Sequence, residues 1–252
     1  MSRALLQAVP ASYVDATVAY LSDGREPIDV SVARAQHGAL VEGMAWLGYD
    51  CAVLGEEGAG PDAVFVEDPV VVHGGVALML RSAHPGRADE GRRLAPVLAR
   101  WGLTIQHMEA PAHADGGDVL VLGDDVYVGR SSRTNEEGAR AIGEALGLRL
   151  HLVTLPGETL HLKCEASPLP GGRVLATRAM AEAMGVEAVI VPDEEAYAAN
   201  VVARGARALC AAGFPATKKA LEEAGFEVRA LDLSEMRKGD GSITCLSVRI
   251  EG

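Results

Sequence analysis

Five polar or reactive side chains follow five glycines at similar distances along the chain. The distances are 13 to 20 residues, and the side chains in chain order are Asp62, Asp115, His161, Asn200 and Cys245. In a repeating fold, positions at similar offsets lie around one axis, so we expect these side chains to converge. A thiol, an imidazole and a carboxylate that meet provide a nucleophile, a general acid and base, and a group that orients the imidazole. The pattern favours covalent hydrolysis, although offsets that vary this much also find polar residues by chance.

The thiol and the imidazole each have a structural alternative. We predict that Cys245 lies in a strand next to the glycine-rich turn at residues 239–241, where a buried structural thiol is the usual outcome. His161 lies in the alternating run 159–163, which predicts a strand with a polar face. Cys164, three residues after His161, is a rival nucleophile.

Charged residues elsewhere could bind a substrate. Acids bracket a short apolar run that predicts a strand at residues 63–66, and these acids are Asp62, Glu67 and Asp68. Carboxylates at both ends of a strand suit a cationic ligand, although loop acids in an acidic protein are more often simply solvated. Four arginines could hold a carboxylate through the bidentate guanidinium fork, although surface arginines are commoner. They are Arg81, Arg87, Arg130 and Arg133.

The elements that must position these residues repeat along the chain. Five alanine-rich helical stretches each end at a glycine that is followed by an alternating apolar run, and the glycines are Gly48, Gly102, Gly147, Gly185 and Gly225. Glycine tolerates the left-handed conformation that ends a helix, and the change of period from 3.6 to 2 predicts a strand behind it. The glycines are 38 to 54 residues apart, which is typical of repeat architectures.

The segments between these steps predict two further short strands in most units, so that each unit reads ββαβ. The predicted strands lie at residues 63–66, 70–72, 76–80, 119–122, 126–128, 200–203 and 207–210. The first helix, at 32–47, has only a short strand at 12–14 before it, and the segment 242–250 follows the last strand. We therefore expect the chain ends to pair and to complete one unit of a closed five-fold α/β-propeller with a central channel. An open, doubly wound parallel sheet is the alternative.

Composition limits the class of protein. The chain has 252 residues and a net charge of −12, which argues against a nucleic-acid partner. No apolar run approaches the roughly 20 residues that span a bilayer, and the first ten residues resemble a secretory signal poorly, so we expect a cytoplasmic protein with no membrane partner. Four cysteines without C-x-x-C spacing indicate neither a disulfide framework nor a cysteine zinc site. We expect one domain over residues 1–252.

Several motifs together resemble the dimethylarginine dimethylaminohydrolases, which belong to the guanidine-modifying superfamily with the pentein, or α/β-propeller, fold. The resemblance covers nearly the whole chain and rests on Phe65-Val66-Glu67-Asp68, Asp115-Gly116-Gly117-Asp118-Val119-Leu120, Gly129-Arg130-Ser131-Ser132-Arg133-Thr134-Asn135, Leu160-His161-Leu162-Lys163, Asp240-Gly241 and Thr244-Cys245-Leu246-Ser247-Val248. Each motif is weak alone, and the set in this order is specific.

The resemblance implies a role for each matching residue. It implies that Cys245 is the nucleophile, His161 the general acid and base, and Asp115 the acid that accompanies His161. It further implies that a guanidinium is bound by Asp62, Glu67 and Asp68, and an α-carboxylate by Arg87 and Arg133, with Arg81 in reserve. The backbone of Gly239 would meet the amino-acid end of the substrate, and a lid would lie around Tyr20-Leu21-Ser22-Asp23-Gly24.

The implied reaction needs no cofactor. The thiolate attacks the central guanidinium carbon of an Nω-methylated arginine, His161 protonates the departing methylamine, and a water activated by His161 hydrolyses the thiouronium to citrulline. Its partner is a small cationic guanidino amino acid. Arginine deimination uses the same thiol and imidazole and remains an alternative, as does a non-catalytic arginine-binding protein of the same fold. The sequence leaves the oligomeric state open.

A metallohydrolase is the alternative from another class. It would use nitrogen and oxygen ligands from His107, His113, Asp115 and Asp118. No H-E-x-x-H or comparable pair supports it, and the two aspartates flank a glycine pair that most simply predicts a turn in which one aspartate caps the backbone.

Overall fold

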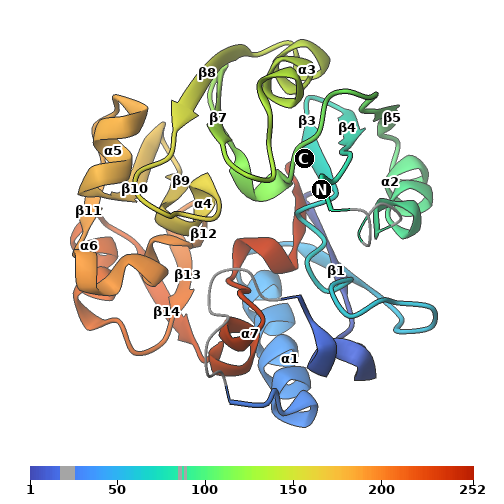
Figure 1. The fold of residues 1–252 in the computed structure, drawn as a ribbon. Helices are drawn as coiled ribbons and strands as arrows, with labels where there is room; N and C mark the ends of the chain where they lie inside the picture. Colours follow the sequence, from blue (N-terminus) through green and yellow to red (C-terminus); the bar gives the residue numbers. More distant parts are fainter. Residues whose placement is uncertain (18–25, 85–86, 88–89) are drawn as a thin grey trace.

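Five three-stranded sheets stand in a ring, each with a helix on its outer side (Figure 1). The computed structural model describes residues 1–17, 26–84, 87 and 90–252. In every sheet the first strand pairs antiparallel with the second, and the second pairs parallel with the third. This is the pentein fold, and it confirms the prediction of five ββαβ units. An open, doubly wound sheet is excluded because, within those residues, no strand of one sheet pairs with a strand of another.

The elements follow the same order in each unit. The strands, in groups of three, are β15 (Val248–Ile250), β1 (Arg3–Gln7) and β2 (Asp50–Leu54); β3 (Val70–His73), β4 (Val76–Met79) and β5 (Thr104–His107); β6 (Val119–Leu122), β7 (Asp125–Arg130) and β8 (Arg149–Thr154); β9 (Ala166–Leu169), β10 (Arg173–Thr177) and β11 (Val189–Val191); β12 (Val202–Arg204), β13 (Arg207–Ala211) and β14 (Glu227–Leu231). The helices between second and third strands are α1 (Val30–Trp46), α2 (Ala95–Arg100), α3 (Glu136–Leu146), α5 (Arg178–Met184) and α6 (Pro215–Glu223).

The five repeat glycines end these helices as the sequence predicts. All five have positive φ, from 65° at Gly147 to 95° at Gly225. At Gly147 and Gly185 the glycine N–H bonds back to a carbonyl of the last helical turn, which satisfies a group that the helix leaves unpaired. A side chain at these positions would strain the backbone, and the chain could not turn directly from helix to strand.

Pairing of the chain ends closes the ring. β1 and β15 are antiparallel, with Arg3 opposite Ile250 and Leu5 opposite Val248. This confirms the expectation that the termini complete one unit together. Both termini lie in the interior of Figure 1, beside the sheets of the first and second units.

Short helices occupy many of the connections. Those from one unit to the next are η4 (Gly116–Asp118), α4 (Leu162–Glu165), η5 (Asp193–Ala199), α7 (Ser234–Lys238) and η6 (Thr244–Leu246), whereas η1 (Ala11–Asp15) and η3 (Glu90–Arg93) lie between the second strand and the helix of their own units. Within the ranges described, no helix is long and apolar enough to cross a bilayer.

Several strand predictions in these connections are wrong. The segment 12–14 belongs to η1, which begins after Pro10, whose fixed φ and missing N–H cannot continue a ladder. Residues 63–66 form turns, because Phe65 N–H donates to the Asp62 carbonyl and not to a neighbouring strand. Strand β12 begins at Val202 and so leaves Asn200 outside it. A short apolar segment that is buried on all sides has the sequence pattern of a strand whether or not it pairs with another strand.

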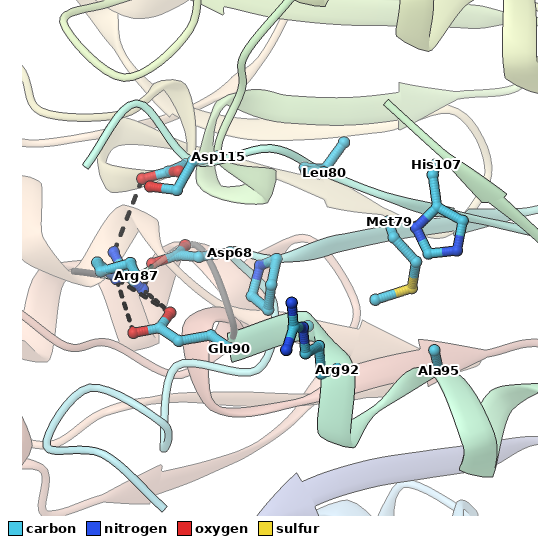
Figure 2. A pocket seen from close by; sticks show the side chains of 12 residues that line it. Asp68, Met79, Leu80, Arg87, Glu90, Arg92, Ala95, His107 and Asp115 are labelled. Atoms are coloured by element: carbon cyan, nitrogen blue, oxygen red, sulfur yellow. Dashed lines mark hydrogen bonds and ion pairs between the residues drawn. The ribbon is translucent and has the colours of Figure 1, made fainter. Parts of the chain in front are cut away.

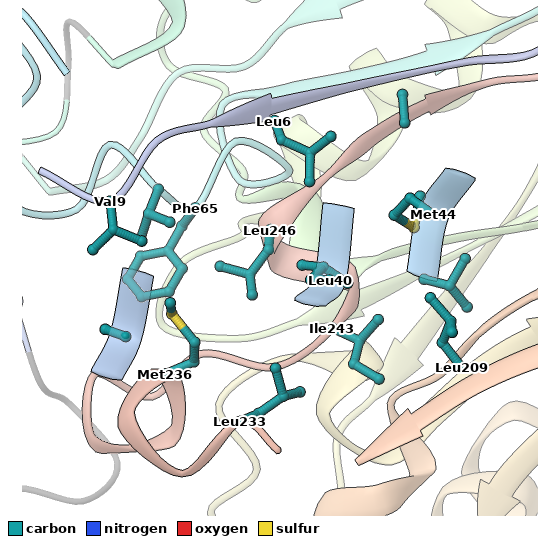
Figure 3. Close-up of a cluster of buried hydrophobic side chains, with 14 of the residues drawn as sticks. Leu6, Val9, Leu40, Met44, Phe65, Leu209, Leu233, Met236, Ile243 and Leu246 are labelled. Carbon is teal, nitrogen blue, oxygen red and sulfur yellow. The ribbon is translucent and has the colours of Figure 1, made fainter. Parts of the chain in front are cut away.

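A large apolar cluster fixes the segment around Cys245 against α1. Ile243 and Leu246 are fully buried beside Leu40 and Met236, as Figure 3 shows. Burying side chains of this size stabilises each by about 1.5–3 kcal/mol relative to exposure. Cys245, which lies between Ile243 and Leu246 along the chain, is therefore held by the core on both sides.

Candidate active site

Cys245 and His161 line one pocket, although they lie far apart in the sequence. The pocket is small, about 40 Å³, and we call it the polar pocket; its lining residues are Thr17, Asp62, Phe65, Asp68, Arg87, Arg133, Leu160, His161, Gly239, Asp240 and Cys245. Seven residues that we assigned from the sequence to binding or catalysis are among them. They are Asp62, Asp68, Arg87, Arg133, His161, Gly239 and Cys245. Tyr20 lies outside the described residues.

Each residue of the five-fold pattern lies in a connection between units. Asp62 follows β2, Asp115 follows β5, His161 follows β8, Asn200 follows β11, and Cys245 follows β14. Each connection runs from the outer, third strand of one unit toward the middle of the ring, where the first strand of the next unit begins (Figure 1). The repeat therefore delivers one chemically active position from each unit to one place.

His161 precedes the short helix α4 and is not part of a strand. Its Nε2 lies 3.6 Å from Asp115 Oδ2, and both side chains are buried. Burial acts to lower the pKa of His161, but Asp118, Asp115, Cys164 and Asp68 outweigh it and hold the pKa well above 6.5. Burial likewise acts to raise the pKa of Asp115, and His161 and two arginines hold it below its ordinary range. The pair is therefore an imidazolium with a carboxylate.

Of the glycine pair before Asp118, Gly117 makes room for this imidazole and Gly116 for the backbone of Glu67. A Cβ at Gly117 would lie 2.7 Å from His161 Nδ1, and one at Gly116 would lie 2.1 Å from the Glu67 carbonyl oxygen. Neither glycine has positive φ, so the requirement is close approach and not backbone conformation. The imidazole lies directly against the backbone of η4.

Asp118 supports the imidazole through the backbone of α4, a role that the sequence did not reveal. Its Oδ1 accepts a hydrogen bond from Leu162 N at 3.1 Å, and its Oδ2 accepts from the hydroxyls of Ser131 and Thr134 at 2.6 and 2.7 Å. The sequence predicted that an aspartate here caps nearby backbone. The backbone that it caps is instead 44 residues away, immediately after His161. The sequence could have indicated this role only if the motif that contains Asp118 had been paired with the motif that contains His161.

Cys245 lies in η6, and the prediction of a strand there is wrong. Thr244 N donates to Asn200 Oδ1 at 2.9 Å, and Asn200 Nδ2 donates to the Thr244 hydroxyl and to the Lys163 carbonyl. The amide of Asn200 thus joins the segment of the thiol to the segment of the imidazole. Ladder pairing starts only at Val248.

The Cys245 thiol is neutral in the ligand-free protein. Burial raises its pKa most, and the carboxylates of Asp68 and Glu67 raise it further. A free thiolate at this position would face two negative charges in a buried setting. A further cation brought into the pocket would oppose that preference.

The three acids have different partners. Both carboxylate oxygens of Asp62 accept hydrogen bonds from Thr17, one from its amide and one from its hydroxyl. Asp68 accepts from Arg87 at 3.0 Å, and burial raises its pKa although Arg87 opposes this. Glu67 does not line the polar pocket.

The Glu67 carboxylate forms ion pairs with two cations outside the polar pocket. Its Oε1 lies 2.6 Å from Lys163 Nζ and 2.7 Å from Arg249 Nη2. Burial acts to raise the pKa of Glu67, but these cations lower it below its ordinary value. The Glu67 amide nevertheless donates to the Cys245 carbonyl at 3.1 Å, so the residue holds the backbone of the thiol in place.

Two of the four candidate arginines reach the polar pocket. Figure 2 shows Arg87 between Asp68, Glu90 and Asp115, with Nε 3.0 Å from each Glu90 oxygen. Arg133 Nη1 lies 4.0 Å from Asp115 and has no hydrogen-bond partner among the described residues. The other two arginines do not line it: Arg81 donates to the Ala112 carbonyl, and Arg130 pairs on the surface with Glu136.

The metallohydrolase alternative has no ligand set. Across the part of the chain that the structure describes, no group of three or more histidines, cysteines, aspartates and glutamates is arranged to hold a metal ion. The Asp118 carboxylate is already committed to three donors.

The closed ring of five ββαβ units and the thiol and imidazole that share a polar pocket define a pentein with the site of a guanidino-modifying hydrolase. Residues 12–165 match the family described as N,N dimethylarginine dimethylhydrolase, eukaryotic. The chain is 37% identical over 230 residues to an N(G),N(G)-dimethylarginine dimethylaminohydrolase of Streptomyces coelicolor, which covers 90% of this chain and 89% of the relative. It is 34% identical over 228 residues to the protein of the same name from Pseudomonas aeruginosa, and this match covers 88% of the present chain and 89% of the relative.

A solved structure gives the same result. A cysteine-to-serine mutant of the Pseudomonas aeruginosa enzyme, complexed with citrulline, superposes with a TM-score of 0.91 at 30% identity and covers 98% of each chain. The present chain belongs to the dimethylarginine dimethylaminohydrolase family.

Proposed function

We propose that this protein hydrolyses Nω-methylated L-arginines to L-citrulline and methylamine or dimethylamine, and that it does so as one catalytic domain. The observation that carries the proposal is the position of Cys245 and His161 in a pocket that is also lined by two carboxylates and two arginines. Asp62 and Asp68 suit a guanidinium, and Arg133 has a free donor for a carboxylate. The names of the bacterial relatives and the citrulline bound in one of them support the same substrate class.

The reaction begins with the loss of the Cys245 proton to water, because the His161 imidazolium already carries its own proton. A guanidinium held near Asp62 and Asp68 offsets their negative charge and favours the thiolate. The sulfur then forms a bond to the central guanidinium carbon, and the electrons of one C–N double bond move to nitrogen. Asp115 keeps the imidazolium of His161 charged and oriented for the next step.

His161 completes the reaction as acid and then as base. The imidazolium gives its proton to the methylated nitrogen, the C–N bond breaks, and the amine leaves a covalent thiouronium on Cys245. The neutral imidazole then takes a proton from water, whose oxygen attacks the same carbon. The C–S bond breaks and releases citrulline and the thiol.

The decisive experiment gives the protein asymmetric dimethylarginine, monomethylarginine and arginine in parallel and measures ureido product from each. We expect product from both methylated substrates and far less from arginine. Greater turnover of arginine, with release of ammonia, would instead establish the deiminase alternative. A protein that binds all three compounds and releases no product would be a binding protein.

The Cys245→Ser variant serves as the matched control. We expect it to lose turnover by about four orders of magnitude or more, as removal of a nucleophile does in other hydrolases. It should still bind the methylated arginines in calorimetry. Turnover equal to that of the wild type would remove Cys245 from the mechanism.

A further inference from the structure

A second cavity meets the polar pocket at the reactive residues. Its volume is about 250 Å³ against about 40 Å³ for the polar pocket. The two cavities share Leu160, His161, Asp240 and Cys245, so the thiol and the imidazole stand between them. We call the larger cavity the side chamber. Another cavity, of about 200 Å³, meets the polar pocket at Asp68 and Arg87, away from the thiol. A ligand whose reacting carbon lies at Cys245 therefore has the side chamber beside that carbon.

The apolar wall of the side chamber is preformed. It is made by Ala196 and Tyr197 from η5 and by Phe214, whose ring lies 5.6 Å from that of Tyr197. Glu195 accepts hydrogen bonds from Thr217 N and Oγ1 and from Ala216 N, which ties η5 to the start of α6. The Tyr197 hydroxyl donates to the Gly241 carbonyl and joins the same wall to the segment that leads to Cys245.

The charge of the side chamber is predominantly negative. Glu165, Asp193 and Glu194 line it, and the two residues of η5 among these are exposed. Asp240 and three cations also line it. The imidazolium of His161 lies near Asp115, Arg237 is stacked on the Tyr197 ring at 4.6 Å, and Lys163 is paired with Glu67. A wall of aromatic and methyl groups beside the exposed carboxylates of Asp193 and Glu194 suits an alkyl group attached to an ammonium ion.

We propose that the side chamber receives the Nω-substituent of the substrate and the alkylamine formed from it, and that it admits alkyl groups larger than methyl. The inference rests on the proposed function. When the C–N bond breaks, the nitrogen keeps the bonding electrons, takes the proton of His161 and departs with its alkyl group on the side that both cavities share. The amine leaves neutral and takes a further proton from water, and the acids of the chamber then hold the resulting alkylammonium ion on its way out.

The test compares Nω-propyl-L-arginine with Nω-methyl-L-arginine in three proteins. In the wild type we expect kcat/KM for the propyl substrate to lie within about tenfold of that for the methyl substrate. Ala196→Leu fills part of the chamber, and it should lower the propyl-to-methyl ratio by at least about tenfold, the discrimination that a methylene or two gives in an apolar pocket. Ala216→Leu is the matched control, because Ala216 is exposed on α6 and does not line the chamber; its ratio should be that of the wild type.

Failure of the inference and failure of the proposed function give different results. Turnover of the methyl substrate with propyl turnover more than a hundredfold lower would overturn the chamber and keep the function. If neither substrate is turned over, the proposed function is refuted, and binding measurements still test whether the side chamber receives the alkyl group. Calorimetry on Cys245→Ser should show Kd values within about tenfold for the two ligands, and adding Ala196→Leu should weaken the propyl ligand selectively. An unchanged Kd ratio would refute the chamber.

Discussion

Cys245 and His161 respond differently to the same acidic pocket. Burial and the nearby acids raise the pKa of Cys245, and the acids raise that of His161 against burial, which favours a neutral thiol and a charged imidazole. A thiol held neutral is a weak nucleophile, so we expect Cys245 to react slowly with electrophiles and oxidants in the ligand-free protein. Selectivity for a guanidinium would thus begin before any contact with the reacting carbon.

This arrangement predicts that an unreactive guanidinium analogue lowers the pKa of Cys245. Because binding then releases the thiol proton, the affinity of the analogue should rise as the pH rises and level off once the free protein is itself ionised. The ultraviolet absorbance of the thiolate, measured across a pH titration with and without the analogue, reports the shift. The Cys245→Ser variant supplies the baseline. Superimposable titrations with and without bound analogue would reject the mechanism of activation.

Short elements between the units position the reactive groups. α4 and η6 are one turn each, and neither would be stable alone, since helices gain most of their stability from packing. They are held by Asp118 at Leu162, by Asn200 at Thr244, and by the apolar residues on either side of Cys245. The glycine pair in η4 completes the arrangement because it lets the imidazole approach the backbone.

Replacing Gly117 with alanine tests the importance of that approach. The new Cβ must displace the imidazole, and a misplacement of about 1 Å typically costs about a hundredfold in rate, so we expect kcat/KM to fall by about that factor. Gly38→Ala is the control: Gly38 is exposed in α1 with nothing within 4 Å of the added Cβ, and the change should stabilise the protein by about 0.5–1 kcal/mol without loss of rate. Steady-state kinetics and urea unfolding measure both effects. Wild-type kinetics in Gly117→Ala would show that the observed position of His161 is not required.

The whole molecule depends on the closure of the ring. The last strand leaves directly from the segment of Cys245 and pairs with the first strand of the chain, so the nucleophile is fixed between the core and the junction of the termini. Leu5 is fully buried at this junction, in a cluster with Val66, Val70 and Val248. Opening the junction would expose apolar surface of two units at once.

Leu5→Ala should therefore lower the free energy of unfolding by about 2–5 kcal/mol, the range for a buried leucine replaced by alanine. Val53→Ala on the neighbouring strand β2 is the control, since Val53 is 45% exposed, and it should cost no more than about 1 kcal/mol. Urea unfolding followed by circular dichroism measures both. Equal losses in the two variants would mean that the junction contributes no more than an exposed strand.

The sequence by itself determined the repeat, the closure of the chain ends and the residue types delivered to the site. These follow from local rules, since a glycine past a helix and a change of period can be read within a few residues. The tertiary structure alone decided that the segments of His161 and Cys245 are short helices, that Asp118 supports His161, that Glu67 pairs with Lys163, and that a second cavity meets the thiol. Each of these depends on contacts between units, such as the bond from Leu162 to Asp118 across 44 residues, and no local pattern specifies which distant group will satisfy a buried donor.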